Sequence, residues 1–368
     1  MRKELDRVQV NGFKSIESLD LSLNRLNVFI GANGAGKSNF ISLFQLISRI
    51  VNKNLQIFVG ESGGPDALLR YGRKTTNELQ ILLGFGRNTY QCVLVPTMEN
   101  RLIFREEKVT FWGEGHAKPY EKFLGSSHIE TKLWDEVSQF GKADIASFAG
   151  ETMSKWQIYH FQDTSVSAKV KQLCPINDNQ FLRPDASNLA AFLYLLQQTH
   201  MPHYRNIVET ISLAAPFFHD FDLRPSPLNA NQIQLEWREK GSDAYFNAYS
   251  LSDGTLRFIC LATLLLQPQL PATIILDEPE LGLHPYAINL LAGMLREASQ
   301  KSQVIVSTQS VTLVNQFEPE DIIVVDRKQK RSEFRRLQSA DYAHWLDEYG
   351  LGELWEKNIL GGRPSHEG

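Results

Sequence analysis

The sequence LNVFI at residues 26–30, followed by GANGAGKS at residues 31–38, decides the fold of this chain. The first stretch is a continuous apolar run of the kind that forms a buried strand. Residues 39–51 carry apolar side chains at helical spacing, so the glycine-rich loop lies between a predicted strand and a predicted helix. The loop matches the pattern GxxxxGKS/T in full, which indicates a phosphate-binding loop in this context.

The residue types in the loop suit phosphate chemistry. Glycines let the backbone turn its N–H groups toward phosphate oxygens, and the helix that follows adds its positive N-terminal end. The ammonium of Lys37 is expected at the β- and γ-phosphates, and the hydroxyl of Ser38 at Mg²⁺. A chance glycine-rich turn is the alternative, but the flanking strand and helix argue against it. The predicted nucleotide-binding residues of this segment are Asn33, Gly34, Ala35, Gly36, Lys37, Ser38 and Asn39.

A second apolar stretch, ATIILDE at residues 272–278, ends in two adjacent acids. A carboxylate at the end of a buried strand is costly to desolvate unless a cation or a donor meets it. We therefore expect Asp277 to hold Mg²⁺ and Glu278 to polarise an attacking water as general base. A strand that simply meets an acidic turn is the alternative, common in isolation but weak beside the phosphate loop.

Between these motifs, LSDGT at residues 251–255 precedes a predicted helix. Ser252 can cap that helix, and Gly254 lets the backbone approach a ligand. By itself the pattern indicates no more than a capped helix. Its position, one helix before the acidic strand, favours a second interpretation as a ligand-binding signature.

The composition fits a folded chain with a sizeable core. The 368 residues are 42% hydrophobic and 22% charged, enough for one large domain or two ordinary ones. Lys and Arg total 38 against 42 Asp and Glu, a formal charge of -4, so a nucleic-acid contact would require a local basic surface. Three widely spaced cysteines argue against zinc or a disulfide framework and favour the cytoplasm. Neither a signal peptide nor a membrane span is expected.

Periodicity predicts an antiparallel part in the first third of the chain. Strands are expected at 8–13 and 19–23, and an antiparallel meander from 79 to 111. Residues 112–185 show one clear strand, at 156–161. Ser187 is expected to cap a helix over residues 188–198. Pro202 is expected to open a second helix, and residues 232–237 to form a strand.

The last third alternates helix and strand, which predicts parallel pairing and an α/β fold. The expected helices cover 255–266 and 285–298, and the expected strands cover 272–276, 303–307 and 322–325. Residues 334–337 are the expected hairpin partner of the last strand.

Four motifs in one order carry a specific resemblance. The phosphate loop, LSDGT, IILDEPELGLHP at 274–285 and VIVSTQS at 304–310 follow one another as in ABC-type ATPase heads. The DEPELGLHP form and the opening stretch at 10–39 resemble the RecF, SMC and OLD-like branch of these ATPases. The resemblance implies an α/β ABC-type P-loop ATPase head with an antiparallel β-subdomain and an inserted helical lobe. It implies a nucleotide-binding lobe at 1–115 and 270–338, a helical signature lobe at 116–269 and a C-terminal tail at 339–368.

The same resemblance implies roles for further residues. Ser252 and Gly254 would contact the γ-phosphate of an ATP held by a second subunit, and residues 280–284 would form the D-loop at that interface. Lys14 stands where heads of this group place a basic residue near the phosphates. Gln162 is the candidate Q-loop ligand of Mg²⁺, although polar residues at strand ends are usually just solvated. The implied cofactors are ATP and Mg²⁺, and the implied assembly is an ATP-dependent homodimer.

Two features depart from the family pattern. Gln309 occupies the switch position, where such heads usually carry histidine, and glutamine donates hydrogen bonds but carries no charge. Slow or partner-dependent hydrolysis is therefore expected. Only a short tail follows Val325, with no room for the Toprim nuclease of OLD-type proteins, so a nuclease is expected on another chain.

Three functions remain open from the sequence. The first is an ATPase that couples dimerisation to DNA or to a separate effector or nuclease chain, in bacterial defence or DNA repair. The second is a nucleotide-gated clamp that scarcely hydrolyses ATP, suggested by Gln309. The third is the ATPase subunit of a membrane transporter, against which the DEPELGLHP form and the long stretch between Ser38 and Leu251 argue.

Two further segments have a structural and a functional interpretation. The basic run RKQKR at 327–331, continued by Arg335 and Arg336, is either a solvated hairpin turn or a contact to a phosphate backbone. The apolar cluster within 341–360 is either core or a partner-docking surface.

Overall fold

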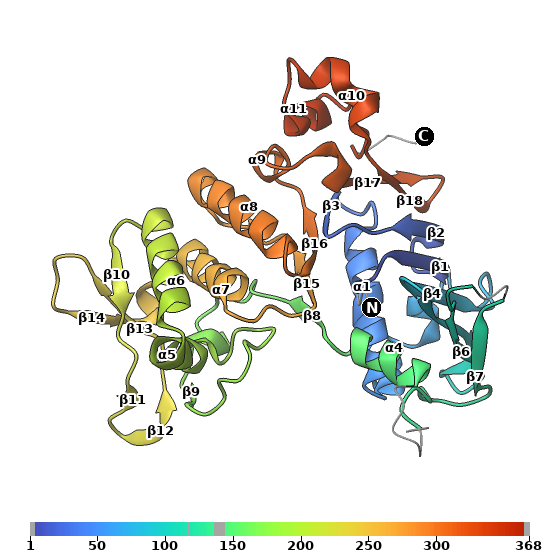
Figure 1. The fold of residues 1–368 in the computed structure, drawn as a ribbon, viewed down its shortest axis with the longest axis horizontal. Coiled ribbons are helices and arrows are strands. Elements are labelled where there is room, and N and C mark those ends of the chain that lie inside the picture. The colour runs from blue at the N-terminus through green and yellow to red at the C-terminus, as the bar shows by residue number, and fades with distance from the viewer. Residues whose placement is uncertain (1–3, 116–117, 136–143, 364–368) are drawn as a thin grey trace. The chain divides into compact units, whose positions relative to one another are not determined.

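The computed structural model of the chain describes residues 4–115, 118–135 and 144–363, and its ribbon is drawn in Figure 1. The chain divides into two compact units. Unit 1 draws on residues 1–156, 319–349 and 354–368, and unit 2 on residues 157–318 and 350–353. The predicted lobes have other boundaries and stay a prediction. Residues 116–117 at one predicted boundary and the last five residues of the predicted tail lie outside the described residues.

A six-stranded antiparallel sheet forms one layer of unit 1. Its strands, in spatial order, are β2 (Ile16–Ser22), β1 (Arg7–Phe13), β4 (Leu79–Phe85), β5 (Asn88–Pro96), β6 (Leu102–Phe111) and β7 (Tyr120–Gly125). The two N-terminal strands and the meander confirm the sequence prediction. Strand β7 extends the sheet within the segment that showed no clear pattern in the sequence.

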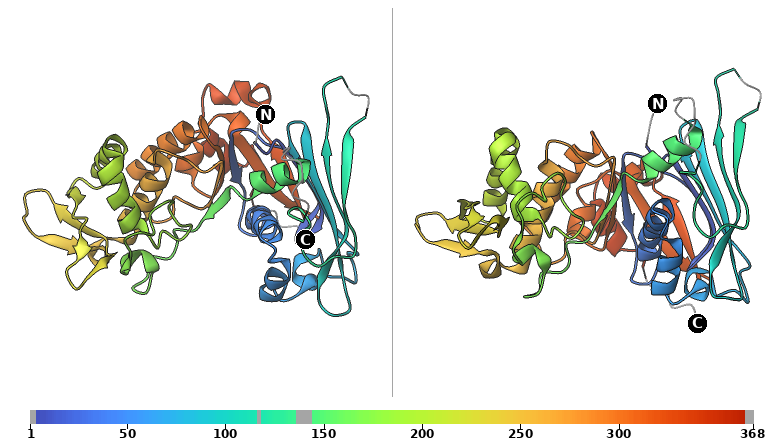
Figure 2. Two further views of the ribbon diagram at one scale, coloured as in Figure 1. Left: turned by 60° about the horizontal axis from the view of Figure 1, so that its bottom comes forward. Right: turned by 90° about the horizontal axis from the view of Figure 1, so that it is seen from below.

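A second group of strands in unit 1 carries the phosphate loop. Strand β3 (Leu26–Ile30) is buried along its whole length and pairs in parallel with β17 (Ile322–Lys328). Strand β17 pairs antiparallel with β18 (Arg331–Arg336), the predicted hairpin. Helix α1 (Lys37–Val51) follows the loop, and Phe40 on it stacks on Phe29 of β3 with ring centroids 4.4 Å apart. Figure 2 shows α1 and α2 (Leu55–Glu61) on one side of the six-stranded sheet.

Smaller elements complete unit 1. Helix α4 (Ile145–Met153) contacts both α1 and β5. The others are α3 (Pro65–Leu68), η3 (Pro319–Asp321), α10 (Ser339–Leu346) and part of α11 (Leu351–Glu356). In the apolar cluster within 341–360, Leu354 and Leu360 are fully buried while Trp345 is 42% exposed. Most of that cluster is therefore core.

Unit 2 combines a parallel strand pair with packed helices. Strands β15 (Thr273–Asp277) and β16 (Gln303–Thr308) pair in parallel, as predicted, with Asp277 opposite Ser307. Helix α7 (Asp253–Leu266) packs against α6 (Met201–Ala214) and α8 (Pro285–Ser299). Helix α5 (Leu189–Thr199) packs on α6, and these helices lie side by side in Figure 1. The described helices include none long and apolar enough to cross a membrane.

Two small antiparallel sheets and several short elements complete unit 2. One sheet contains β10 (Phe218–Phe221), β13 (Glu236–Glu239) and β14 (Tyr245–Asn247). The other contains β11 (Pro225–Ser226), β12 (Asn229–Ile233) and β9 (Cys174–Pro175). The short elements are β8 (Trp156–Tyr159), η1 (Lys169–Lys171), η2 (Ala248–Ser250) and α9 (Val311–Val314).

Three local predictions were wrong. Helix α5 has Asn188 rather than Ser187 at its N-cap, and the Asn188 amide instead donates to the carbonyls of Asp178 and Phe181. The strand expected at 232–237 is split between β12 and β13, because the chain passes from one small sheet to the other there. Strand β8 ends at Tyr159, before the predicted end at Phe161. The Asn188 bonds are to the loop just before α5, whereas the split of the strand follows the pairing of two separate sheets.

Candidate functional site

The glycine-rich loop of unit 1 joins β3 to α1 as the sequence predicts. Gly34 and Gly36 have φ values of 77° and 124°, which favour glycine. A Cβ at Gly36 would also collide with the Ser332 hydroxyl. As N-cap of α1, Gly36 has no side chain, and the first turn of this helix carries no acid. The positive end of α1 is therefore suited to an anion such as a phosphate.

Lys37 lies inside the loop. Its side chain is buried, and its Nζ donates to the carbonyl oxygens of Gly31 at 2.6 Å and Ala32 at 3.2 Å. A buried ammonium is tolerated only where acceptors replace water, and here the loop's own carbonyls do so. Ser38, next along the chain, is exposed. The loop thus combines the Lys37 ammonium, the exposed Ser38 hydroxyl and the N-terminus of α1. Together these groups fit a nucleotide phosphate.

Two serines that the sequence analysis missed hold the far end of the loop. The buried Ser332 hydroxyl of β18 donates to the carbonyl of Ala35 and shares a 2.7 Å hydrogen bond with Ser15. The amide of Asn39 donates to the Ser15 hydroxyl at 2.6 Å. Asn39, predicted to contact nucleotide, is therefore engaged in fixing the loop. The sequence around Ser332 contains no pattern that indicates this contact, because Ser332 lies 317 residues from Ser15 along the chain.

Two basic side chains approach this segment. Lys14, with φ of 47°, donates from Nζ to the Ser42 hydroxyl on α1 at 2.7 Å, and burial lowers its pKa. Lys14 therefore contacts the helix that follows the loop. Arg327 of the basic run donates from Nη1 to the carbonyl of Gly34 at 2.9 Å. The sequence analysis did not connect Arg327 with the loop.

In unit 2, Asp277 is the last residue of β15 and Glu278 follows it. Glu278 has φ of 46°, a strained conformation for a residue with a side chain, and its N–H donates to the carbonyl of Ser307 at 2.8 Å. The Nε2 of Gln309 donates to the Glu278 carboxylate. Strain of this kind is found where surrounding structure fixes a functional residue. The predicted base and the predicted switch residue therefore meet in the structure.

Gln162 contacts the end of β15. Its Nε2 donates to the carbonyl of Asp277 at 3.2 Å, so the candidate Q-loop residue and the candidate Mg²⁺ ligand are neighbours. Arg257 of α7 donates to the carbonyls of Phe161 at 3.1 Å and Gln162 at 3.2 Å, and also to that of Leu281. Arg257 was not singled out in the sequence, yet it joins three segments of unit 2.

The LSDGT segment forms the N-terminus of α7. The Ser252 hydroxyl accepts from the N–H of Thr255 at 3.2 Å, which confirms the cap, and Ser252 is exposed. A Cβ at Gly254 would collide with the carbonyl oxygen of Gly282. The close approach that Gly254 permits is thus to the turn at 280–284. Its contact with a nucleotide on a second subunit stays a prediction.

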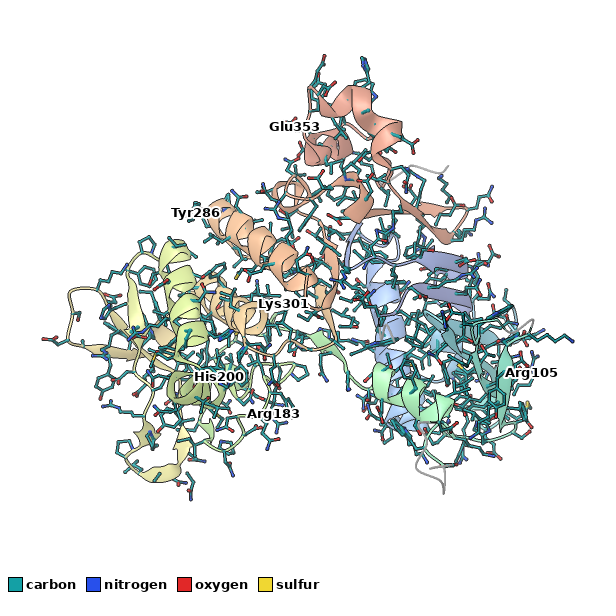
Figure 3. The ribbon with its side chains drawn as sticks, viewed as in Figure 1. Arg105, Arg183, His200, Tyr286, Lys301 and Glu353 are labelled. Atoms are coloured by element: carbon teal, nitrogen blue, oxygen red, sulfur yellow. The ribbon has the colours of Figure 1, made fainter. Side chains whose placement is uncertain are left out.

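The turn at 280–284 leads directly into α8. His284 is the N-cap of this helix, and its Nδ1 accepts from the N–H of Tyr286 at 3.3 Å. Figure 3 labels Tyr286, in the first turn of α8, and Lys301, which follows the C-cap Gln300. His284 therefore has a structural role here, as the cap of α8.

Comparisons with solved structures identify the fold. The SmcHead bound to the C-winged helix domain of ScpA is 16% identical, with a TM-score of 0.61 over 92% of this chain and 99% of that one. A second Smc head domain, with an extended coiled coil and bound to the C-terminal domain of ScpA derived from Pyrococcus furiosus, is 13% identical. Its TM-score is 0.57 over 94% of this chain and 98% of that one. No curated protein matches the sequence.

Family models cover most of the chain. One, described as "Protein of unknown function (DUF2813)", matches residues 3–100. Another, described as "AAA domain, putative AbiEii toxin, Type IV TA system", matches residues 106–315, more than half of the chain. Together with the α/β fold of SMC heads, this match supports the RecF and SMC-like resemblance noted in the sequence. The chain belongs to this AAA domain family and has the fold of an ABC-type ATPase head.

Proposed function

We propose that this protein binds ATP through the loop at 31–38 and hydrolyses it with Glu278 as general base. The observation that carries the proposal is the complete phosphate loop at the uncapped N-terminus of α1. The acid pair that ends β15 supports it, since an apolar strand ending in two carboxylates suits a cation and an activated water.

Each residue has a defined task in this proposal. Lys37 neutralises charge on the terminal phosphates, and the backbone N–H groups of the loop bind their oxygens. Glu278 accepts the proton of the attacking water, and Gln309 holds the Glu278 carboxylate through its amide. Mg²⁺ would neutralise phosphate charge, and Ser38, Asp277 and Gln162 offer the oxygen ligands that it prefers.

We also propose an ATP-dependent homodimer that acts on a separate effector chain in bacterial defence. The exposed Ser252 at the N-terminus of α7 supports the dimer, because a helix N-terminus with a free face suits the γ-phosphate of a partner's ATP. The family description names a toxin of a type IV TA system, and the two similar head structures carry a bound ScpA domain. The alternative within this proposal is a role in DNA repair, with DNA bound by the basic hairpin at 327–336.

The central test separates binding from hydrolysis. Lys37→Ala should lower ATP affinity at least tenfold, because the charge on the phosphates is no longer met. Glu278→Gln should keep ATP bound while turnover falls about 100-fold or more, because the base is gone. Nucleotide binding is measured with a fluorescent ATP analogue and turnover by phosphate release.

The matched control is Glu297→Gln on α8, which removes an acid whose side chain is 61% exposed and pairs with Lys301. It should leave both quantities unchanged. Normal steady-state hydrolysis by purified Glu278→Gln protein would refute the assignment of the base.

A nucleotide-gated clamp is the second candidate. It is favoured by the neutral Gln309, whose amide is already engaged by Glu278. A wild-type protein that binds ATP and dimerises but does not release phosphate would establish the clamp and exclude the enzyme.

A further inference from the structure

Glu280 is a buried acid with an unusual set of partners. The residue is 6% exposed. One carboxylate oxygen, Oε1, accepts from the Thr308 hydroxyl and from the Gln309 N–H at 3.1 Å. Within the described residues, the other oxygen has no hydrogen-bond partner. Burying a carboxyl group with one oxygen unmet is costly, so hydrophobic packing alone does not explain an acid here.

The partners of Glu280 belong to the segment that carries the switch residue. Glu280 binds the backbone of Gln309, while Glu278 binds its side-chain amide. Gln309 is thus held at both ends by two acids that lie two positions apart. The backbone hydrogen bond fixes the position of the Gln309 main chain. The side-chain amide of Gln309 in turn fixes the position of the Glu278 carboxylate.

Glu280 also begins the turn at 280–284. Its carbonyl accepts from the N–H of Leu283 at 3.0 Å, which closes the turn. The same turn is in contact with α7, because Gly282 lies against Gly254 and Arg257 binds the carbonyl of Leu281. A displacement of the N-terminus of α7 would therefore reach Gln309 through this turn and Glu280.

We propose that Glu280 is a positioning residue that places Gln309 and, through it, the carboxylate of Glu278, and that it couples the LSDGT segment to these two side chains. This inference rests on the proposed hydrolytic function and adds a residue that acts without touching ATP. Its immediate partners are Thr308 and Gln309, and its route to the LSDGT segment runs through residues 281–283.

The experiment compares three substitutions. Glu280→Ala should lower kcat about 10- to 100-fold, as loss of a supporting hydrogen-bond partner does, with KM for ATP unchanged. Glu280→Gln should stay within about threefold of wild type, because an amide oxygen still accepts both hydrogen bonds. Thr308→Val should give an intermediate kcat. The matched control is Thr263→Val, which removes another buried hydroxyl, one bonded only to the Ile259 carbonyl of its own helix.

A second measurement does not depend on hydrolysis. Without nucleotide, amide hydrogen exchange in a peptide that contains Gln309 should be faster in Glu280→Ala than in wild type, and unchanged in Thr263→Val. If wild-type protein fails to hydrolyse ATP, the proposed function fails, and hydrogen exchange alone decides the positioning role. The inference is overturned if exchange at Gln309 is unchanged. It is also overturned if Glu280→Ala and Glu280→Gln lower kcat by the same factor and both lower the melting temperature.

Discussion

Glu278 and Gln309 depend on each other. The backbone of Glu278 adopts φ of 46°, and its carboxylate accepts from the Gln309 amide. Glutamine supplies a donor at this position but no positive charge. Under the proposed function, the residue at position 309 would influence how much of the charge that develops during hydrolysis is stabilised.

Gln309→His should raise the hydrolysis rate, by roughly two- to tenfold, because a protonated imidazole adds positive charge near the transferring phosphoryl group. Turnover of the two forms is compared at equal dimer content. A slower histidine form would show that glutamine already matches the Glu278 carboxylate, and the explanation of slow hydrolysis would be wrong.

The β17–β18 hairpin divides its basic residues between structure and surface. Arg336 donates to Asn27 Oδ1 at 2.6 Å and to the Ser22 carbonyl at 3.0 Å, and burial lowers its pKa. Arg335 donates to the Leu360 carbonyl at 2.7 Å. These two side chains make hydrogen bonds that stabilise the fold, although Arg335 is exposed. The tip at 327–331 presents the other cations of the run, and Glu333 pairs with Lys328 and Arg331.

The DNA contact through residues 327–336 stays a prediction, and its test replaces the cations at the tip. Joint replacement by serine should weaken DNA binding and flatten its salt dependence, because fewer counterions are released. The replaced residues are Arg327, Lys328, Lys330 and Arg331. ATP affinity is measured on the same protein, since Arg327 also contacts the carbonyl of Gly34.

A control protein carries serine at four exposed lysines elsewhere, namely Lys155, Lys169, Lys240 and Lys301. It should keep the salt slope of wild type. If the hairpin variant keeps that slope as well, the tip is ordinary solvated surface.

The chain as a whole is proposed to dimerise around ATP. Ser252 is exposed at the start of α7, where the helix offers its positive end and a hydroxyl. Ser252→Arg should leave ATP binding nearly intact while abolishing both dimerisation and turnover, because the bulky cation blocks the partner's phosphate. Light scattering with and without ATP, in the Glu278→Gln background, measures the dimer; turnover is measured without that change.

Leu228→Arg is the control for added charge, since Leu228 is 99% exposed in unit 2. It should dimerise and hydrolyse like wild type. Dimerisation and hydrolysis that persist in the Ser252→Arg form would leave Ser252 as a helix cap and nothing more.

Local sequence patterns determined the elements that carry the proposed chemistry. The apolar run at 26–30, the glycine loop and the helix after it are contiguous, so their strand, turn and helix follow from steric and hydrogen-bonding rules within a few residues. The same holds for the Ser252 cap and for the acids that end β15. The assignment of these residues to nucleotide chemistry stays a prediction until the variants are measured.

Tertiary structure decided what holds those elements in place. Ser332 reaches the loop from 297 residues beyond Ala35, and Glu280 meets Gln309 across 29 residues. Sequence periodicity records which face of an element is buried, but not which distant polar group meets it there. A buried hydrogen bond between remote segments produces no pattern in the sequence, because the packing of the whole unit determines which two groups meet.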